Sequence, residues 1–177
     1  MDLKGKKVLV FGAGKSGIGA ADLLGSVGAQ PIIYDGNENL DKEAVLHKTN
    51  GTYTPEIWAG AFPEGEMESL DLVVLSPGVP TDLPLVKSFY EKGLPVWSEV
   101  ELAYRTGKGE VLAITGTNGK TTTTALLGKI MGDARESVFV VGNIGTAYTS
   151  KSLEMREDSV TVAEISSFQL ETIEQFR

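Results

Sequence analysis

Short apolar runs alternate with amphipathic stretches along the first hundred residues. The runs are four to six residues long, as expected of buried strands, and the segments between them space apolar residues as a helix does. This alternation predicts an α/β fold with βαβ units and a Rossmann-like parallel sheet. The predicted strands are 7–11, 31–35, 70–75 and 95–97, with a weaker one near Trp58, and the predicted helices are 16–27, 41–48, 83–92 and 98–104.

The same alternation restarts after a polar segment with two glycines at 105–109, which is typical of a domain boundary. We therefore predict a first domain over residues 1–106 and a second over 107–177. In the second domain a helix follows strand 111–114, and its apolar stripe is Ala125, Leu126, Leu127, Ile130 and Met131. Two more strands, 137–141 and 159–165, leave the second sheet unfinished, so we expect an incomplete P-loop-type α/β domain and a truncated chain.

Composition narrows the class of protein. The chain has 177 residues, 41% of them hydrophobic, which is globular composition. Its net charge of -8 and lack of clustered Lys and Arg argue against nucleic-acid partners. It has no cysteine, a single His47 to which we assign no role, and no apolar run long enough for a signal peptide or a membrane span. We expect a soluble, cytoplasmic monomer without membrane partners.

The turn between strand 111–114 and its helix has the composition of a phosphate-binding loop. Gly116 and Gly119 allow backbone N–H groups to converge on an anion, Lys120 adds a positive charge, and Thr121 can supply a hydroxyl ligand to Mg²⁺. The spacing departs from G-x-x-x-x-G-K because Ile114 stands where that motif needs glycine. The alternative is an ordinary glycine turn with a solvated lysine.

A second glycine-rich turn, residues 12–17, matches G-x-G-x-x-G between a strand and a helix, and Asp35 follows at the distance of a ribose-binding acid. Taken alone this pattern predicts NAD, but glycine in such a turn can also serve packing alone. Because a dehydrogenase has no need of a second phosphate loop, we favour another nucleotide or nucleotide sugar at residues 12–17.

Several motifs occur in an order that resembles the Mur ligase family, and in particular its D-glutamate-adding branch. They extend across the whole chain. The motifs are Gly12 to Gly17, Asp35, Ser76-Pro77-Gly78, Ile114 to Thr122, Gly142-Asn143-Ile144-Gly145 and Glu164 to Leu170.

The resemblance implies an ATP- and Mg²⁺-dependent amide ligase of peptidoglycan synthesis. ATP would phosphorylate the carboxylate of UDP-N-acetylmuramoyl-L-alanine, and the amine of D-glutamate would attack the acyl phosphate. It implies Lys120 and Glu164 as catalytic residues and Thr121 and Glu164 as metal ligands. It also implies ATP binding by Gly116, Thr117, Asn118, Gly119, Lys120, Thr121 and Thr122, and substrate binding by Lys15, Ser16, Gly17, Asp35, Gly78, Asn143, Ser166 and Gln169.

Two of these implied contacts have a plain structural alternative, because Asn143 and Gln169 can simply satisfy backbone groups at strand and helix ends. The family's remaining metal ligands and its D-glutamate site would lie beyond this chain. Made alone, the chain is expected to bind a uridine nucleotide weakly and form no product. The other readings are a uridine-nucleotide-binding module without catalysis and an NAD-binding oxidoreductase domain.

Overall fold

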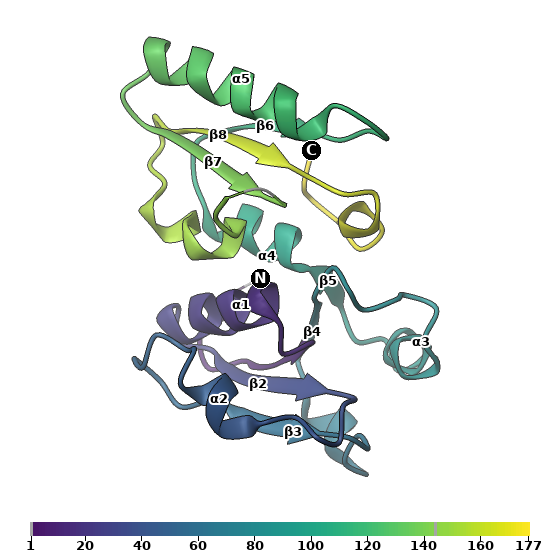
Figure 1. The fold of residues 1–177 in the computed structure, drawn as a ribbon. Coiled ribbons are helices and arrows are strands. Elements are labelled where there is room, and N and C mark those ends of the chain that lie inside the picture. Colours follow the sequence, from purple (N-terminus) through teal and green to yellow (C-terminus); the bar gives the residue numbers. More distant parts are fainter. Residues whose placement is uncertain (1, 144) are drawn as a thin grey trace. The chain divides into compact units, whose positions relative to one another are not determined.

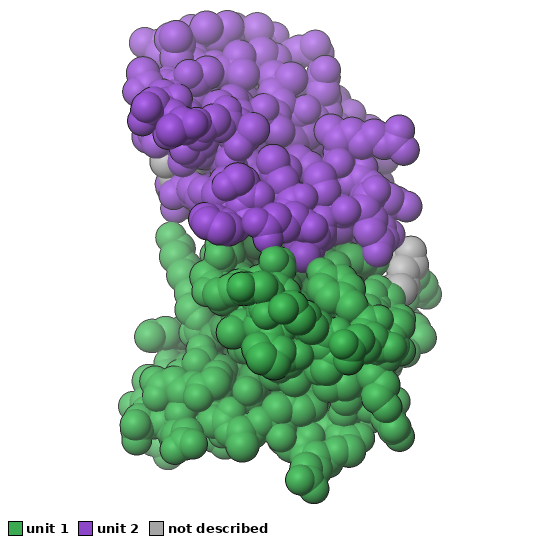
Figure 2. Space-filling model, turned by 90° about the vertical axis from the view of Figure 1, so that its right-hand side faces the viewer, with its two compact units in different colours: residues 1–99 green, residues 100–177 purple. Residues whose placement is uncertain are grey.

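The computed structural model describes residues 2–143 and 145–177, which form two compact units, 1–99 and 100–177 (Figures 1 and 2). Each unit has its own parallel sheet. The expected α/β class is therefore confirmed. The expected boundary at residues 106–107 falls inside the second unit, because helix α4 packs into the core of that unit.

Unit 1 is a five-stranded sheet in the order β3-β2-β1-β4-β5, with every neighbouring pair parallel. The strand order reverses direction between β1 and β4, which is where ligands bind in doubly wound folds. Its elements are β1 Lys7–Phe11, α1 Lys15–Ser26, β2 Gln30–Asp35, α2 Lys42–Leu46, β3 Glu56–Ala59, a 3₁₀ helix Glu66–Ser69, β4 Leu72–Leu75, α3 Pro84–Glu91 and β5 Val96–Ser98.

The central strands of unit 1 are apolar because both of their faces are covered. Val8, Leu9, Val10 and all four residues of β4 are buried, as expected for a parallel sheet between two helical layers. Phe89 of α3 lies in the core on one side, and α1 contributes small and branched residues on its buried face. This packing holds the carboxyl ends of β1, β2 and β4 in register at one edge.

Unit 2 is a three-stranded parallel sheet in the order β6-β8-β7, so the last strand in sequence lies in the middle. Helix α5 packs along β8 and β7 on one face, while α4 contributes to the core on the other (Figure 1). The elements are α4 Glu99–Thr106, β6 Glu110–Ile114, α5 Lys120–Ala134, β7 Val138–Gly142, β8 Val160–Glu164 and 3₁₀ helices Tyr148–Ser150, Ser152–Glu154 and Phe168–Leu170.

Helix α5 does not bury the apolar stripe that the sequence predicts. Its buried positions are Thr124 and Gly128, whereas Leu126 and Ile130 are 60% and 52% exposed. The physical reason is close approach: a Cβ at Gly128 would overlap the side chain of Val140 in β7. The helix therefore lies against the sheet along a line of small residues.

The segment 105–109, expected to be a domain boundary, is closely packed. A Cβ on Gly107 would lie 3.1 Å from Sδ of Met155, and one on Gly109 would overlap the carbonyl oxygen of Ser159. Thr106 Oγ1 donates to the carbonyl of Leu102 and lies 3.2 Å from Ser152 Oγ. Glycine at these two positions therefore provides room for neighbouring backbone.

Candidate functional site

The glycine loop of unit 1 joins β1 to α1 at the carboxyl edge of the sheet, and its glycines differ in what they are needed for. Gly12 has a φ of +107°, and a Cβ there would lie 2.9 Å from Ser76. A Cβ on Gly17 would overlap the carbonyl oxygen of Gly12. Gly14 has nothing within 4 Å of its Cβ position and an ordinary φ of -76°. Packing therefore requires Gly12 and Gly17, whereas Gly14 leaves open space at the start of α1.

Gly14 is the N-cap of α1 and provides no side-chain cap, so the helix presents its N-terminal N–H groups at this open point. Lys15 and Ser16 follow directly as the first residues of the helix. Backbone donors and the positive end of the helix dipole together form a site for an anionic group. The geometry suits a diphosphate approaching across Gly14.

Asp35 at the end of β2 fixes this loop. Its Oδ2 accepts from the backbone N–H of Ala13 at 3.0 Å, and its Oδ1 accepts from the N–H of Asn37 at 3.0 Å. The carboxylate thus ties together the two loops that follow β1 and β2, and its remaining lone pairs can accept from a ligand.

Ser76 is a residue that the sequence motifs pointed to only as part of Ser76-Pro77-Gly78. It donates from Oγ to the carbonyl of Gly12 at 3.3 Å and so links the ends of β1 and β4. Gly78 beside it has open space at its Cβ position. In the sequence, the feature that could have identified Ser76 as a functional residue is its position directly after a buried strand.

The second glycine loop joins β6 to α5 in unit 2. Gly116 and Gly119 have φ values of +144° and +79°, so both take conformations that favour glycine, and Gly119 caps α5 without a side chain. Lys120 Nζ donates to the carbonyl of Gly116 at 2.7 Å and thereby folds across the loop. Thr121 and Thr122 are exposed in the first turn of α5. The loop therefore has the backbone shape, the cation and the hydroxyl of a phosphate cradle.

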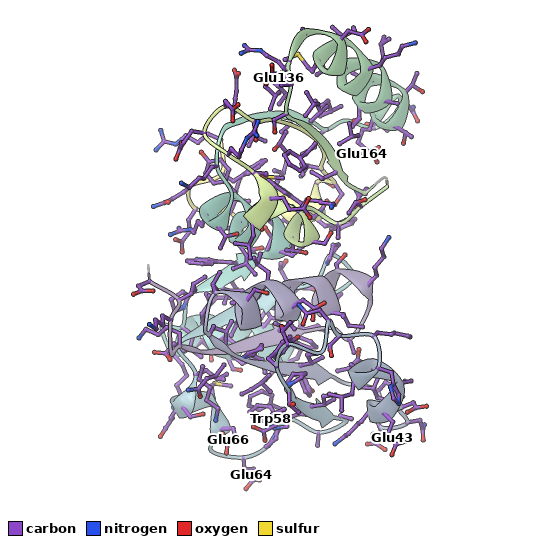
Figure 3. The ribbon with its side chains drawn as sticks, turned by 90° about the vertical axis from the view of Figure 1, so that its left-hand side faces the viewer. Glu43, Trp58, Glu64, Glu66, Glu136 and Glu164 are labelled. Atoms are coloured by element: carbon purple, nitrogen blue, oxygen red, sulfur yellow. The ribbon has the colours of Figure 1, made fainter. Side chains whose placement is uncertain are left out.

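Glu164 is the last residue of β8 and pairs in register with Ile114 at the end of β6. Glu164 is only 5% exposed, and its carboxylate oxygen Oε2 is buried without a hydrogen-bond partner among the described residues. Figure 3 labels it within unit 2. A buried carboxylate oxygen is costly unless a hydrogen-bond donor or a cation satisfies it, and the carboxylate of Glu164 has the oxygen chemistry that binds Mg²⁺.

Within 2–143 and 145–177 no group of three or more His, Asp or Glu side chains could hold a metal ion. A cation here would therefore need ligands besides carboxylates and imidazoles of these residues. The hydroxyl of Thr121 and phosphate oxygens have the hard oxygen chemistry that Mg²⁺ prefers.

The three remaining residues expected to bind the substrate, Asn143, Ser166 and Gln169, lie in unit 2. Asn143 follows β7, is exposed, and donates its N–H to the carbonyl of Glu164 at 3.1 Å; Ile144 of the same motif lies outside the described residues. Gln169 is 3% exposed, and its Oε1 accepts from the N–H and Oγ of Ser166 at 2.7 and 2.9 Å. These bonds give Gln169 a structural role in the loop after Glu164, and ligand contact by these residues stays a prediction.

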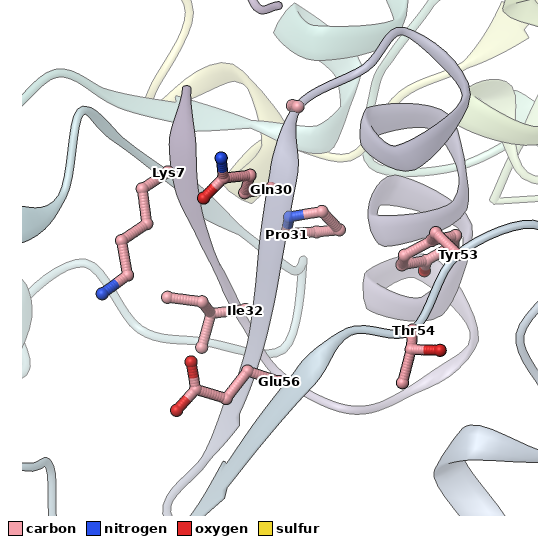
Figure 4. Close-up of a pocket in the computed structure, with 8 residues that line it drawn as sticks. Lys7, Gln30, Pro31, Ile32, Tyr53, Thr54 and Glu56 are labelled. Atoms are coloured by element: carbon pink, nitrogen blue, oxygen red, sulfur yellow. The ribbon is translucent and has the colours of Figure 1, made fainter. Parts of the chain in front are cut away.

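A cavity of about 300 Å³ lies at the amino ends of β1, β2 and β3, away from the glycine loop (Figure 4). Its charged groups are engaged elsewhere, since Lys7 Nζ donates to Glu66 Oε2 and Glu56 Oε1 accepts from Trp58 Nε1. Its described lining residues therefore offer no free charged group to a ligand.

The described residues contain no helix long and apolar enough to cross a membrane.

Comparison with known proteins agrees with the two-part organisation. Residues 6–98 match the family model "Mur ligase MurD-like, N-terminal domain", and residues 114–177 match "Mur ligase middle domain". The two matches place one glycine loop in each family domain.

Two curated relatives are UDP-N-acetylmuramoylalanine--D-glutamate ligases. The one from Lachnospira eligens is 58% identical over 99% of this chain, and the one from Lachnoclostridium phytofermentans is 56% identical over all of it. The chain spans 39% of the length of each.

Among solved structures, a murein peptide ligase from Psychrobacter arcticus superposes with a TM-score of 0.54 at 20% identity. That superposition covers 93% of this chain and 39% of the other, and it supports the fold alone. The sequence motifs, the two glycine loops and the family matches agree, and the chain therefore belongs to the Mur ligase family.

Proposed function

We propose that this chain supplies the nucleotide-binding parts of an ATP-dependent ligase that adds D-glutamate to UDP-N-acetylmuramoyl-L-alanine. Unit 2 binds ATP with Mg²⁺, and unit 1 binds the uridine diphosphate end of the substrate. The observation that carries the proposal is in unit 2, where a phosphate cradle with Lys120 lies at the same edge of the sheet as a buried carboxylate oxygen of Glu164 that has no hydrogen-bond partner in the described part of the chain. The family and the similar ligases support the choice of substrates.

The chain's residues contribute mainly charge and position to such a reaction. Lys120 exchanges its bond to the Gly116 carbonyl for one to the β- and γ-phosphates. The backbone of residues 116–119 and the N-terminus of α5 bind phosphate oxygens, and Thr121 and Glu164 hold Mg²⁺, which neutralises phosphate charge when bound. Phosphoryl transfer to a carboxylate depends chiefly on such positioning and charge neutralisation.

In unit 1 the N-terminus of α1 binds the diphosphate through the backbone of residues 15–17. Asp35 ends β2 and Gly78 lies in the loop after β4, and these two strands flank β1, so a ribose or base extending from that diphosphate can be bound there. This assignment rests on the open space at Gly14, a position where packing does not require glycine.

Thermal unfolding measured with each ligand tests the proposal. We expect ATP with Mg²⁺ and a UDP-sugar each to raise the melting temperature, because a ligand that binds only the folded state stabilises it. Lys120→Met should abolish the shift by ATP and leave the shift by UDP-sugar intact. Lys129→Met, which removes an exposed lysine from the same helix, is the matched control and should keep both shifts.

The other functions give different patterns. Stabilisation by UDP-sugar but not by ATP with Mg²⁺ would indicate a uridine-nucleotide-binding module without catalysis. Stabilisation by NADH would indicate an oxidoreductase domain. Equal ATP shifts in wild type and Lys120→Met would contradict the role of the cradle.

A further inference from the structure

The two faces of β8 have different surroundings, and Glu164 belongs to the face that α5 covers. Ala163 and Ile165 lie in the core that contains Val100 and Ala103 of α4. Because successive side chains of a strand point to opposite faces, Glu164 points away from that core. The side chain of Glu164 is therefore on the face of the sheet that α5 covers, since α5 packs against this strand.

Thr124 lies on the sheet-facing side of α5 at the level of Glu164. One helical turn further along, Gly128 approaches Val140 of β7. Val140 is in register with Val162, and Gly142 with Glu164. One helical turn covers about 5.4 Å and two strand residues about 6.6 Å, and α5 runs back along the sheet from the carboxyl edge. Moving one turn from Gly128 towards the cradle therefore brings Thr124 to the Gly142–Glu164 row.

The hydroxyl of Thr124 makes no hydrogen bond to the backbone of its own helix. The residue is 0% exposed, and its Oγ1 lacks a hydrogen-bond partner among the described residues. A threonine within a helix commonly donates to the carbonyl four residues earlier, as Thr106 does to Leu102. Valine has the same shape without the cost of a buried unpaired hydroxyl, so packing does not explain threonine at 124.

Thr124 and Glu164 thus bring two buried polar atoms to one level of the same interface, and neither atom has a hydrogen-bond partner among the described residues, so the two side chains do not bond to each other in this structure. We propose that Thr124 is a positioning residue for the cation site: when the cation binds, the Thr124 hydroxyl donates to one oxygen of the Glu164 carboxylate and directs the other oxygen at Mg²⁺. Groups that orient metal ligands in this way set ligand geometry without touching the metal. This inference rests on the proposed function, because it assumes that the cradle binds ATP with a divalent cation.

The test compares Thr124→Val with Thr124→Ser. Binding of Mn²⁺, as a paramagnetic substitute for Mg²⁺, is followed by electron paramagnetic resonance in the presence of ATP, and thermal unfolding is measured without ligand. We expect Thr124→Val to bind Mn²⁺ roughly tenfold more weakly while its ligand-free melting temperature stays equal or rises, because a buried unpaired hydroxyl has been removed. Thr124→Ser keeps the hydroxyl and should bind Mn²⁺ as the wild type does.

A purely structural threonine would give the opposite pattern, with a lower melting temperature for Thr124→Val and unchanged Mn²⁺ affinity, and that result would overturn the inference. Weak binding by Thr124→Ser equal to that of Thr124→Val would overturn it as well. If the wild type binds Mn²⁺ with ATP but all variants match it, only the inference fails. If the wild type binds neither ATP nor Mn²⁺, the proposed function fails and the inference fails with it.

Discussion

Gly14 and Gly17 belong to one motif, yet the structure distinguishes why each is glycine. Gly17 lies so close to the Gly12 carbonyl that a side chain cannot fit, whereas Gly14 has open space and a φ of -76°. The motif alone allowed a packing role, a nicotinamide site or another nucleotide site. At the residue scale, packing explains Gly17 and does not require glycine at position 14, where the approach of a ligand is our proposal.

Alanine substitutions separate these two roles. Gly17→Ala should reduce the free energy of unfolding by about 3 kcal/mol because the new Cβ overlaps backbone. Gly14→Ala should change it by less than about 1 kcal/mol but weaken UDP-sugar binding roughly tenfold, a loss of about 1.4 kcal/mol, because the methyl group occupies the approach to the helix N-terminus. Urea unfolding and calorimetric titration measure the two quantities.

The matched control is Gly132→Ala in α5, a glycine that also has open space at its Cβ position. It should leave UDP-sugar binding unchanged. Undiminished UDP-sugar affinity in Gly14→Ala would contradict a ligand at the start of α1.

At the scale of elements, α4 holds the last residues of the chain through one buried carboxylate. Glu101 is 0% exposed and accepts from the backbone N–H groups of Glu174, Gln175 and Phe176 at 3.0 to 3.2 Å, and from Arg105. Burial by itself would raise the pKa of Glu101, but the bonds from Phe176, Arg105, Glu174 and Gln175 outweigh it and lower that pKa below its ordinary value of 4.5. α4 and the segment after β8 therefore form one structural piece.

Glu101→Gln should reduce the free energy of unfolding at neutral pH by about 3 kcal/mol, because an amide oxygen replaces a buried charge that accepts several bonds. A lowered folded-state pKa contributes stability that is complete above the unfolded value of 4.5 and is lost as pH falls through the folded value. The wild type should therefore lose more stability between about pH 5 and pH 3 than Glu101→Gln does. Urea unfolding across this range measures both curves.

Glu174→Gln provides the comparison, since it changes only a half-exposed partner of Arg105: the side chain of Glu174 is 52% exposed. It should cost less than about 1 kcal/mol and retain the acid dependence of the wild type. Parallel pH curves for wild type and Glu101→Gln would argue against ionised Glu101 as the anchor of the C-terminal segment.

At the scale of the whole molecule, each unit has its own sheet, its own core and one glycine loop. A ligand that binds one loop mainly stabilises the elements that hold this loop in place. Local stability can therefore be raised in one unit at a time.

Hydrogen exchange should show this separation directly. A UDP-sugar should slow amide exchange in residues 2–99, most strongly at the start of α1, where we propose that backbone N–H groups bind the diphosphate. ATP with Mg²⁺ should slow exchange in residues 100–177, most strongly around 116–122. Protection of residues 116–122 by UDP-sugar alone would contradict the assignment of one ligand to each loop.

Much of the fold and both loops could be predicted from local patterns. Apolar runs and helical spacing indicated the β1–α1–β2 unit, β4, β6 and β8 to within a few residues, because strand and helix periods are properties of the chain itself. The glycine loops were recognisable since positive φ and close approach favour one residue type. The division between Glu99 and Val100 was not predictable, because it depends on where α4 packs.

The sequence by itself determined the α/β class, the two glycine loops, the cation Lys120 and the acid Glu164 at the end of a buried strand. Only the tertiary structure decided which polar groups have hydrogen-bond partners. Glu101 holds residues 174–176 and Asp35 holds the first loop, whereas Thr124 and Glu164 each keep a buried oxygen without a partner within residues 2–143 and 145–177. The physical reason is that helix and strand patterns arise from neighbours along the chain. Burial and hydrogen-bond pairing, in contrast, depend on residues far apart in sequence that meet only when the sheet and helices pack.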